Sequence, residues 1–465
     1  MKRPAISIVL IVHNTAPWLP ACLNSIAAQS FDDYEIVVVD VASNLATKGV
    51  LARRWRSLRR ARPLILLRNV GGATAGNLGI ARAKGRYVFL MDSDDLLPQH
   101  ALRELYRAAE RDRLDIAIGR GLSYIDNKPR PLRYSADRIT WARPLVTESL
   151  AAHPELTMAP YYWGRLYRRD FLLRNRIEMR PGQLFADRYF TSKALKLSRR
   201  TGVVAQDAYY WRRDRAATAD AQSITQRAAS LASVRDRLAS FADTETLFDP
   251  VREGGILAYV RAANLMRLFI HAKSIVGAGG GEAARRCREF VELARPFAQT
   301  FTTDEILAAE FLLARHRVQW YLLAQNRPDD LIAFLNSHAD AERLTEGGVV
   351  RHAYWSILPD LPRELCVEAR RSIGPVVAER GQRNGSPVLT VSAEIPEGMA
   401  VELLGVVAWP NRPRRSVRPR SQAVGPDQLI VESPDELGLD EHPPLALEYL
   451  AAGRVCSAPI TVAEP

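Results

Sequence analysis

The sequence lacks the features that mark secreted, membrane-spanning or zinc-binding proteins. It has four cysteines in 465 residues, and Cys22, Cys287, Cys366 and Cys456 show no C-x-x-C spacing, which argues against a disulfide framework or a zinc site. No apolar run approaches the ~18 residues of a membrane span. The apolar start MKRPAISIVLIVHN has no small-residue cleavage site after it, so we interpret it as a first β-strand. We expect a reducing cytoplasm, with any membrane contact peripheral, at the inner face of the cell membrane.

Several catalytic signatures are also missing. The Gly-rich stretch NVGGATAGN lacks the Lys-Ser/Thr pair of a phosphate-binding P-loop, and no G-x-G-x-x-G follows the first predicted strand. No G-x-S-x-G nucleophile elbow occurs, and the eight histidines have no metal-ligand spacing. These absences argue against an ATPase, a dinucleotide-dependent dehydrogenase and a hydrolase.

Length and charge favour a multidomain protein with acidic partners. The chain is long enough for about three domains. Its formal net charge of +12, carried mostly by arginine, suits nucleic acid, an anionic lipid surface, or a phosphate-bearing polymer or nucleotide. Because no recognised nucleic-acid module surrounds the basic segment WPNRPRRSVRPR (409–420), we do not expect nucleic acid. That segment is either an exposed loop or a grip for a polyanion.

Three stretches of the chain differ in their hydrophobic pattern. To about residue 100, the buried-type runs AISIVLIV, EIVVV, LILL and RYVFLM alternate with helix-like segments, which predicts a mainly parallel, Rossmann-like α/β sheet. Mixed segments complete this first domain, 1–225. Residues 226–372 have helical periodicity and predict a helical connector, whereas 373–465 is Pro-rich with short alternating runs and a turn at Ala452 and Gly453. We therefore expect a C-terminal all-β, sandwich-like domain.

Polar residues follow each predicted strand of the first domain. His13 and Asn14 follow the first strand, Asp40 the second, the segment 69–72 the third and Asp92 the fourth. Open α/β sheets bind ligands at the carboxyl ends of their strands, so these residues are expected to meet in one crevice.

The segment MDSDDLLP (91–98) crowds three aspartates together. In an extended backbone Asp92 and Asp94 point to the same side, which makes an oxygen-rich site suited to Mg²⁺ or Mn²⁺ together with substrate phosphate oxygens. The alternative is an Asp-rich turn that caps a helix beginning near Leu96. Asp95 is expected to be that cap.

At four ordered places the sequence resembles the family 2 inverting glycosyltransferases of the GT-A fold, which build cell-surface polysaccharides. The similar segments are ISIVLIVHNTAPWLPACLNSIAAQSFDDYEIVVVD, NVGGATAGNLGIARAKGRYVFLMDSDD, WGRLYRRDFL, and FADRYF followed by YYWRRDRAATADAQSIT. The resemblance covers about residues 5–225. It implies a hexosyltransferase with a DXD motif and a Mn²⁺ or Mg²⁺ cofactor.

The resemblance also implies site residues. His13 and Asn14 would form the uracil pocket, where His13 replaces a usual tyrosine, and Asp40 would accept a hydrogen bond from the base. Further nucleotide and metal contacts would come from strand ends and loops: Asn69, Gly72 and Asn77 along the nucleotide, Asp92 at the ribose or metal, and Asp94 on the metal. Asp187 would be the catalytic base. The acceptor-facing set would be Trp163, Arg165 and Tyr167, and the segment that closes over the diphosphate would supply Arg212 or Arg213 with Ser223.

Three positions depart from the family pattern. Val41 replaces an aspartate in DVAS, Gly76 occupies the place of a frequent nucleotide-contacting arginine, and Ala186 replaces a glutamate before the base. The first two bear on the nucleotide, and the Gly-Asn pair is similar to members that use a dTDP-sugar such as dTDP-rhamnose. The third is compatible with a weakened or inactive enzyme.

We therefore predict metal-dependent, inverting sugar transfer from a UDP-sugar, UDP-N-acetylglucosamine or a UDP-hexose, to a hydroxyl of an anionic cell-surface polymer such as a teichoic acid or capsular polysaccharide. The alternatives are a dTDP-sugar transferase, a catalytically silent polymer-binding or assembly protein, and a sugar nucleotidyltransferase. The C-terminal domain is expected to serve polymer binding or a homo-oligomer, a dimer or trimer.

Overall fold

A computed structural model describes the following residues of the chain: 3–58, 60–132, 137–213, 229–277, 280–346, 349–369, 376–383, 386–395, 401–408, 421–423, 427–432, 445–451 and 454–462. Ser223, the segment 409–420 and the turn expected at Ala452 and Gly453 lie outside the described residues.

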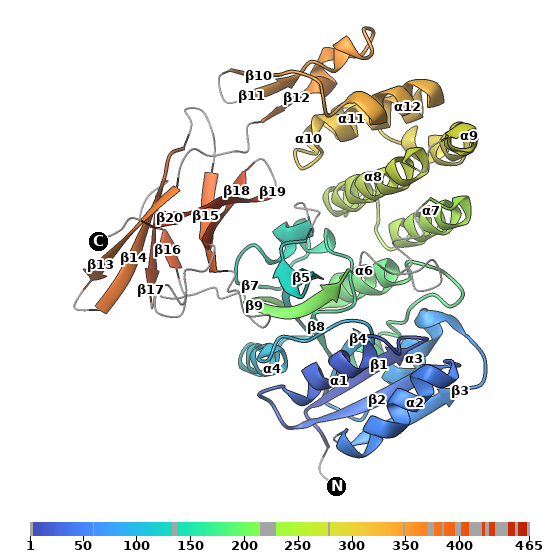
Figure 1. The fold of residues 1–465 in the computed structure, drawn as a ribbon, viewed down its shortest axis with the longest axis vertical. Helices are drawn as coiled ribbons and strands as arrows, with labels where there is room; N and C mark the ends of the chain where they lie inside the picture. The colour runs from blue at the N-terminus through green and yellow to red at the C-terminus, as the bar shows by residue number, and fades with distance from the viewer. Residues whose placement is uncertain are drawn as a thin grey trace.

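A mixed sheet of nine strands forms the first part of the molecule (Figure 1). Its parallel half contains β1 (Ile6–Val12), β2 (Tyr34–Val41), β3 (Ala61–Leu66) and β4 (Tyr87–Asp92) in the spatial order β3-β2-β1-β4. The helices α1 (Leu19–Ala27), α2 (Leu45–Arg54) and α3 (Gly71–Arg82) connect them. This arrangement is the predicted Rossmann-like half-sheet.

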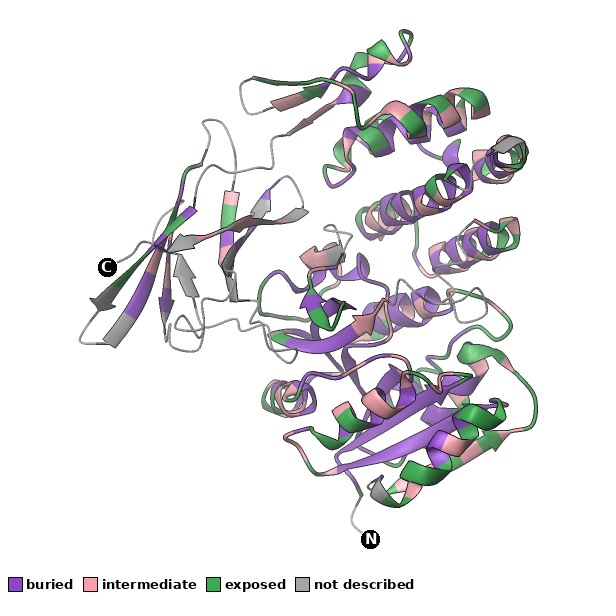
Figure 2. Cartoon of the chain, viewed as in Figure 1, coloured by how far each residue is buried: buried purple, intermediate pink, exposed green. Residues whose placement is uncertain are grey.

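The apolar runs explain which strands lie inside. β1, β2 and β4 are buried along almost their whole length, as continuous Val/Ile/Leu runs predict (Figure 2). LILL has the same composition, but β3 is the edge strand, and Ile65 is 63% exposed. α3 packs close to the sheet because Gly79 lies against Val9 of β1. A Cβ at position 79 would come within 2.2 Å of the Val9 Cγ1 atom.

The second half of the sheet is folded back against β4. β8 (Arg165–Arg168) runs antiparallel between β4 and β5 (Ile116–Ile125), and β9 (Thr201–Arg212) pairs parallel with β5. The remaining elements of this half are β6 (Lys128–Arg130), β7 (Leu145–Thr147), α4 (Ala101–Arg111), α5 (Arg169–Arg174) and α6 (Asp187–Leu197). This path brings the ends of β4 and β9 side by side, with an isolated bridge between Leu96 and Tyr210.

Helices then form a layer of their own, above the sheet in Figure 1. They are α7 (Leu231–Glu245), α8 (Gly254–Val276), α9 (Gly280–Ala298), α10 (Thr303–Ala308), α11 (Ala314–Ala324) and α12 (Pro328–Ser337). α7, α8, α9 and α11 bury one core, and α7 packs against α6. No described helix is long and apolar enough to cross a bilayer.

The helical layer ends earlier than the sequence predicted. Within 226–372, the part after Ser337 forms a three-stranded antiparallel sheet of β10 (Arg343–Glu346), β11 (Val349–His352) and β12 (Val367–Ala369). Val349 and Val350 are β-branched residues that favour this extended backbone.

The C-terminal part is all-β, as predicted. β13 (Val376–Arg383), β14 (Ser386–Ala393), β16 (Ser421–Ala423), β17 (Gln428–Glu432) and β20 (Thr461–Val462) form one sheet. β15 (Val401–Ala408), β18 (Leu445–Ala451) and β19 (Arg454–Pro459) form a second. Leu389 and Leu429 of the first sheet share a buried core with Leu403 and Leu447 of the second, so the two sheets pack face to face.

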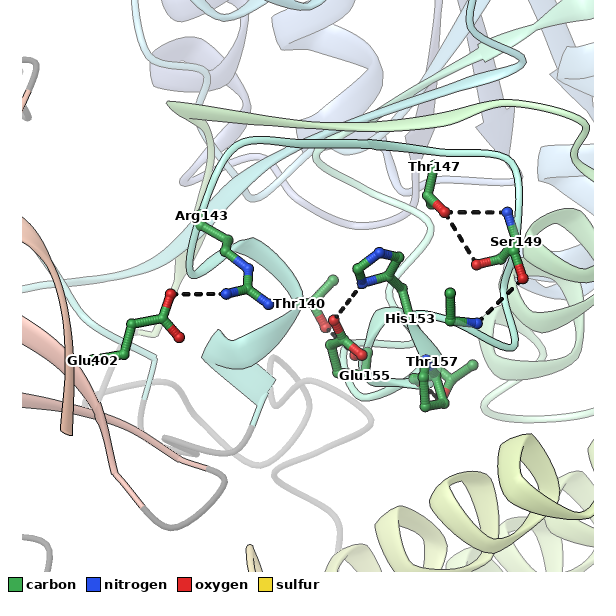
Figure 3. A network of polar contacts seen from close by, with 10 residues as sticks. Thr140, Arg143, Thr147, Ser149, His153, Glu155, Thr157 and Glu402 are labelled. Carbon is green, nitrogen blue, oxygen red and sulfur yellow. Dashed lines mark hydrogen bonds and ion pairs between the residues drawn. The ribbon is translucent and has the colours of Figure 1, made fainter. Parts of the chain in front are cut away.

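The segment 137–157 connects the three parts (Figure 3). Arg143 forms an ion pair with Glu402 of β15, with 2.7 Å between Nη1 and Oε1. Its turn of 3-10 helix, η2 (Asp137–Trp141), packs against β19, and the turn η3 (Pro154–Thr157) packs against α8. The Thr140 hydroxyl donates to the Glu155 carbonyl over 3.0 Å and joins the two turns.

Candidate active site

The strand register brings the predicted site residues to one edge of the sheet. Val12 of β1 lies opposite Asp40 of β2, and Ile11 lies opposite Asp92 of β4. The carboxyl ends of β1, β2 and β4 therefore meet where the strand order reverses, between β1 and β4.

His13, Asn14 and Asn69 form an exposed polar cluster at this edge. The His13 ring lies 2.7 Å from the Val41 carbonyl through Nδ1, and its Nε2 lies 3.2 Å from the Asn69 amide nitrogen and 3.3 Å from that of Asn14. A carbonyl can only accept and an amide NH₂ can only donate, so this pattern fits a neutral imidazole that carries its proton on Nδ1. Asn14 has a left-handed backbone (φ 55°).

Three other predicted nucleotide residues have internal partners or an open surface. Asp40 is buried, and its Oδ1 accepts from the Ser43 amide over 3.0 Å. Both amide atoms of Asn77 pair with the backbone of Met179, at 2.8 and 2.9 Å, which ties α3 to the loop before Asp187. Gly72 is exposed in the first turn of α3, and a Cβ there would touch nothing within 4 Å.

Gly76, the second departure from the family pattern, has a packing reason. A Cβ at position 76 would come within 2.9 Å of the Met179 Cε atom. A longer side chain would therefore need Met179 to move, because Met179 fills the space next to position 76.

Two of the three aspartates at the end of β4, Asp92 and Asp95, have different hydrogen-bond partners. Asp92 is half-buried, and its Oδ1 accepts from the Tyr162 hydroxyl over 2.5 Å. Asp95 is buried, and its two oxygens accept from the Tyr209 hydroxyl at 2.6 Å and the Arg212 amide at 2.7 Å. The expectation that Asp95 caps a helix is wrong, because the next helix begins only at Ala101 and Asp95 instead joins the ends of β4 and β9.

Burial and mutual repulsion raise the proton affinity of these carboxylates. The pKa of Asp92 is raised to about 7, first by desolvation and then by the charge of Asp94, while the Tyr162 hydroxyl opposes the shift. Desolvation also raises the pKa of Asp94, opposed by the nearby Arg212 guanidinium. Ionising both carboxylates is unfavourable when they are alone, because their charges repel each other. A cation bound between them would favour the ionised form of both.

Asp187 lies at the first position of α6, where its Oδ1 accepts from the Arg188 amide over 3.0 Å. Desolvation raises its pKa, whereas the charges of Arg188, Arg237 and Arg267 lower it. Asp187 in turn adds to the raised pKa of Asp92, which places the two carboxylates within electrostatic reach of each other. The charge of Asp187 thus acts on Asp92, although Asp187 lies about one hundred residues later in the chain.

The segment predicted to face an acceptor is mostly buried. Trp163 stacks on Tyr209 with 4.7 Å between ring centroids, Arg165 donates from Nη2 to the Ala159 carbonyl at 2.5 Å, and Tyr167 is fully buried. The half-buried side chain directed at the carboxylates is instead Tyr162, which sequence reasoning did not select. The paired tyrosines in YYWG were the available signal.

Arg212 ends β9 beside the carboxylates. Its guanidinium lies 5.9 Å from the Tyr124 ring centroid, and its Nε is buried with no hydrogen-bond partner among the described residues. The charge of Arg212 lowers the pKa of Asp94. Arg213, the other residue named for this role, lies with its guanidinium 5.0 Å from the Trp211 ring centroid.

The donor set suits a divalent cation shared with a substrate. In the described part of the chain, no three His, Cys, Asp or Glu side chains group together as a complete metal site. Asp92 and Asp94 provide carboxylate oxygens, which Mg²⁺ and Mn²⁺ prefer, and their mutual repulsion would be relieved by a positive ion. The chain fits a metal held by two carboxylates with phosphate oxygens and water completing the shell.

Comparisons with known proteins agree with this geometry. Residues 7–174 match the family model described as Glycosyl transferase family 2. The chain is 28% identical over 214 residues to an uncharacterized glycosyltransferase, EpsJ, of Bacillus subtilis, covering 45% of this chain and 61% of EpsJ. It is 31% identical over 124 residues to the poly(ribitol-phosphate) β-N-acetylglucosaminyltransferase TarP of Staphylococcus aureus, covering 26% of this chain and 37% of TarP. The chain thus spans less than two thirds of each of these relatives.

Solved structures share the fold beyond the first part of the chain. S. aureus TarS superposes with a TM-score of 0.56 and 15% identity, covering 99% of this chain and 78% of TarS. Residues 1–349 of TarS, crystallised with UDP-GlcNAc, superpose with a TM-score of 0.56 and 16% identity, covering 75% of this chain and 96% of that one. Residues 7–174 thus resemble glycosyl transferase family 2, and the strand order 3-2-1-4 with carboxylates at its switch point gives this part of the chain the GT-A fold.

Proposed function

We propose that this chain is a metal-dependent, inverting glycosyltransferase that moves a sugar from a UDP-sugar, UDP-N-acetylglucosamine or a UDP-hexose, to a hydroxyl of an anionic cell-surface polymer. The observation that carries the proposal is the position of Asp92 and Asp94 at the switch point of a GT-A sheet, with the charge of Asp187 acting on Asp92. A pair of carboxylates can hold a cation against a diphosphate, and a third can act as a base.

The donor end of the site would be formed by the exposed polar cluster. His13, Asn14 and Asn69 present a flat imidazole and amide groups beside the end of β1, which suits stacking and hydrogen bonding to a pyrimidine. Asp40 accepts a hydrogen bond from the Ser43 amide through Oδ1, which would fix the loop after β2, and its other oxygen would contact the base. The neighbour crystallised with UDP-GlcNAc supports a UDP-sugar as the donor. A dTDP-sugar has a similar shape and is therefore the alternative donor.

Asp94 and Asp92 would hold Mn²⁺ or Mg²⁺. When bound, such an ion neutralises the charge that develops on the departing diphosphate. Tyr162 donates to Asp92 and keeps one oxygen of that carboxylate oriented, while Asp95 holds the Arg212 backbone next to the pair. The Arg212 guanidinium would add positive charge on the diphosphate side.

Asp187 would take the proton from the acceptor hydroxyl. Attack from the face opposite the leaving nucleotide inverts the anomeric configuration. Because desolvation raises its pKa, Asp187 is a stronger base than an exposed aspartate, and the charges of the arginines around it oppose that rise. Trp163, Arg165 and Tyr167 would support the acceptor side by positioning Tyr162 and the loop before β8.

An anionic polymer suits the acceptor because the chain carries a net charge of +12 and two relatives are named as poly(ribitol-phosphate) transferases. We also propose that the C-terminal sheets bind polymer or assemble a dimer or trimer, with 1–225, 226–372 and 373–465 as the functional units. The enzyme would work in the cytoplasm.

The test measures release of nucleoside diphosphate from a panel of UDP- and dTDP-sugars with a poly(ribitol-phosphate) acceptor, in Mn²⁺ or in chelator. Asp94→Ala and Asp187→Asn should each lose release, and Asp329→Asn, an 80% exposed aspartate, is the matched control that should keep it. Asp187→Asn should still bind UDP, because the base is not part of the nucleotide pocket.

Other outcomes would redirect the assignment. Polymer binding without release from any donor would support a silent binding protein, and formation of pyrophosphate would support a nucleotidyltransferase. Release that survives both the chelator and Asp94→Ala would refute the role of the carboxylate pair.

A further inference from the structure

The side of the first sheet that ends in the edge strand β3 is strongly cationic. Between Asp40 and Asp92 the chain contains no acidic residue, but it contains eleven basic ones, Lys48 and Lys84 with nine arginines. Most of them lie on α2, on the turn η1 (Trp55–Ser57) and on β3 and the residues beside it, and Arg53, Arg54, Arg56, Arg60 and Arg68 are exposed. Such a field attracts an anionic surface.

Large apolar side chains project from the same edge. Leu67, directly after β3, is 97% exposed, Leu45 at the start of α2 is 87% exposed, and Ile65 of β3 is 63% exposed. Val41 lies opposite Leu66 in the β2–β3 register, so Leu45 and Leu67 both follow strand ends on the same edge. Together with the exposed arginines they form what we call the β3 surface.

We propose that the β3 surface binds the anionic headgroup and acyl boundary of a membrane, with Leu45, Ile65 and Leu67 inserted and the arginines on lipid phosphates. Basic residues rimming exposed aliphatic ones are the composition of interfacial membrane contacts. The surface lies at the lower right end of the molecule in Figure 1, away from α9–α12 and the C-terminal sheets. Leu67 is two residues from Asn69, so contact would bring the carboxyl edge of the sheet close to the bilayer.

Two other occupants fit less well. A soluble polyanion would engage the arginines but leave three aliphatic side chains in water. A second copy paired through its own β3 would oppose arginine to arginine, because the carboxylates beside this strand, Asp33 and Glu35, already form ion pairs with Arg60 and Arg62 of the same chain. The combination of charge and exposed aliphatic groups favours lipid.

Binding of the full chain to phosphatidylcholine vesicles, with and without phosphatidylglycerol, tests the proposal without any sugar donor. The wild type should float with the anionic vesicles only, and added salt should weaken binding. Leu45→Gln with Leu67→Gln should reduce partitioning by about tenfold or more, since two inserted aliphatic side chains are lost. Arg53→Gln with Arg56→Gln, two exposed arginines of α2 and η1, should reduce it by about fivefold for each charge.

Matched controls lie elsewhere on the surface. Val251→Gln changes a 91% exposed apolar residue, and Arg285→Gln with Arg288→Gln removes two charges from α9. These controls should bind vesicles like the wild type, and thermal melting confirms that every variant is folded.

Equal binding by all variants, or none by the wild type, overturns the proposal. Loss with the arginine pair alone, matched by equal loss of binding to soluble polyphosphate, would assign the surface to a polyanion. A concentration-dependent dimer in light scattering that the leucine variants abolish, with no vesicle binding, would assign it to a second copy.

Discussion

Tyr162→Phe should lower turnover at neutral pH, because it should leave less of Asp92 in the ionised form. The Tyr162 hydroxyl donates to Asp92 over 2.5 Å and opposes the desolvation that raises the pKa of that carboxyl to about 7. A hydrogen bond to a charged group contributes about 1.5–3 kcal/mol, so its loss should raise the proton affinity of Asp92 about ten- to a hundredfold. Since the proposed cation would be held by the carboxylate form, the variant should bind metal more weakly wherever Asp92 is protonated.

The size of the effect depends on pH in a defined direction. At pH 7 about half of the wild-type Asp92 is ionised, against about a tenth or less in the variant, so release at subsaturating Mn²⁺ should fall about five- to fiftyfold. At pH 9 Asp92 is almost fully ionised in the wild type and about half to nine tenths ionised in the variant, so the two rates should agree within about twofold. The assay is diphosphate release against pH at several Mn²⁺ concentrations, with Tyr106→Phe on α4 as a control that should keep the wild-type profile. A loss that is equal at pH 7 and pH 9, or no loss at all, would refute this reasoning.

Other predictions concern the base, the helix packing and the metal. Because the Arg237 charge lowers the pKa of Asp187, Arg237→Gln should move the acidic limb of the rate profile to higher pH, measured by kcat between pH 5 and 9. Gly79→Ala should destabilise the fold by about 1–3 kcal/mol in urea unfolding, because its Cβ would meet Val9, whereas Gly72→Ala, which meets nothing, should change stability little. Chelation of Mn²⁺ should abolish turnover and leave the melting temperature of the free protein unchanged, since two carboxylates alone hold the ion weakly.

Much of the first sheet was predictable because its signal is local. The apolar runs of β1, β2 and β4 fixed buried parallel strands, and the polar residues after them then had to meet at the carboxyl edge. The apolar run of β3 correctly predicted a strand, but it wrongly predicted that this strand is buried on both faces. Whether a strand is central or at an edge depends on strand order, which no single run contains.

Contacts between distant segments were the part that sequence could not supply. Tyr162 meets Asp92 across seventy residues, and Asn77 meets Met179 across 102. The sequence around a tyrosine next to a tryptophan, or around an asparagine in a Gly-rich helix, does not indicate its distant partner. The sequence therefore pointed to Trp163 and not to Tyr162. Asp95 was likewise assigned to the next helix, although its partners lie on β9.

The surroundings of Asp187 argue that the helical layer is part of the site rather than a spacer. Arg188 comes from α6 itself, but Arg237 comes from α7 and Arg267 from α8. The Arg237 guanidinium lies 3.3 Å from the ring centroid of Phe185, two residues before the base, and Arg267 donates to the Met158 carbonyl at 2.6 Å. A shift of the acidic limb in Arg237→Gln would mean that α7 influences the proton affinity of Asp187. A first domain that ends at residue 225 lacks α7, so its turnover at low pH should then fall while its nucleotide binding is kept. An unshifted limb would restrict α7 to packing against α6.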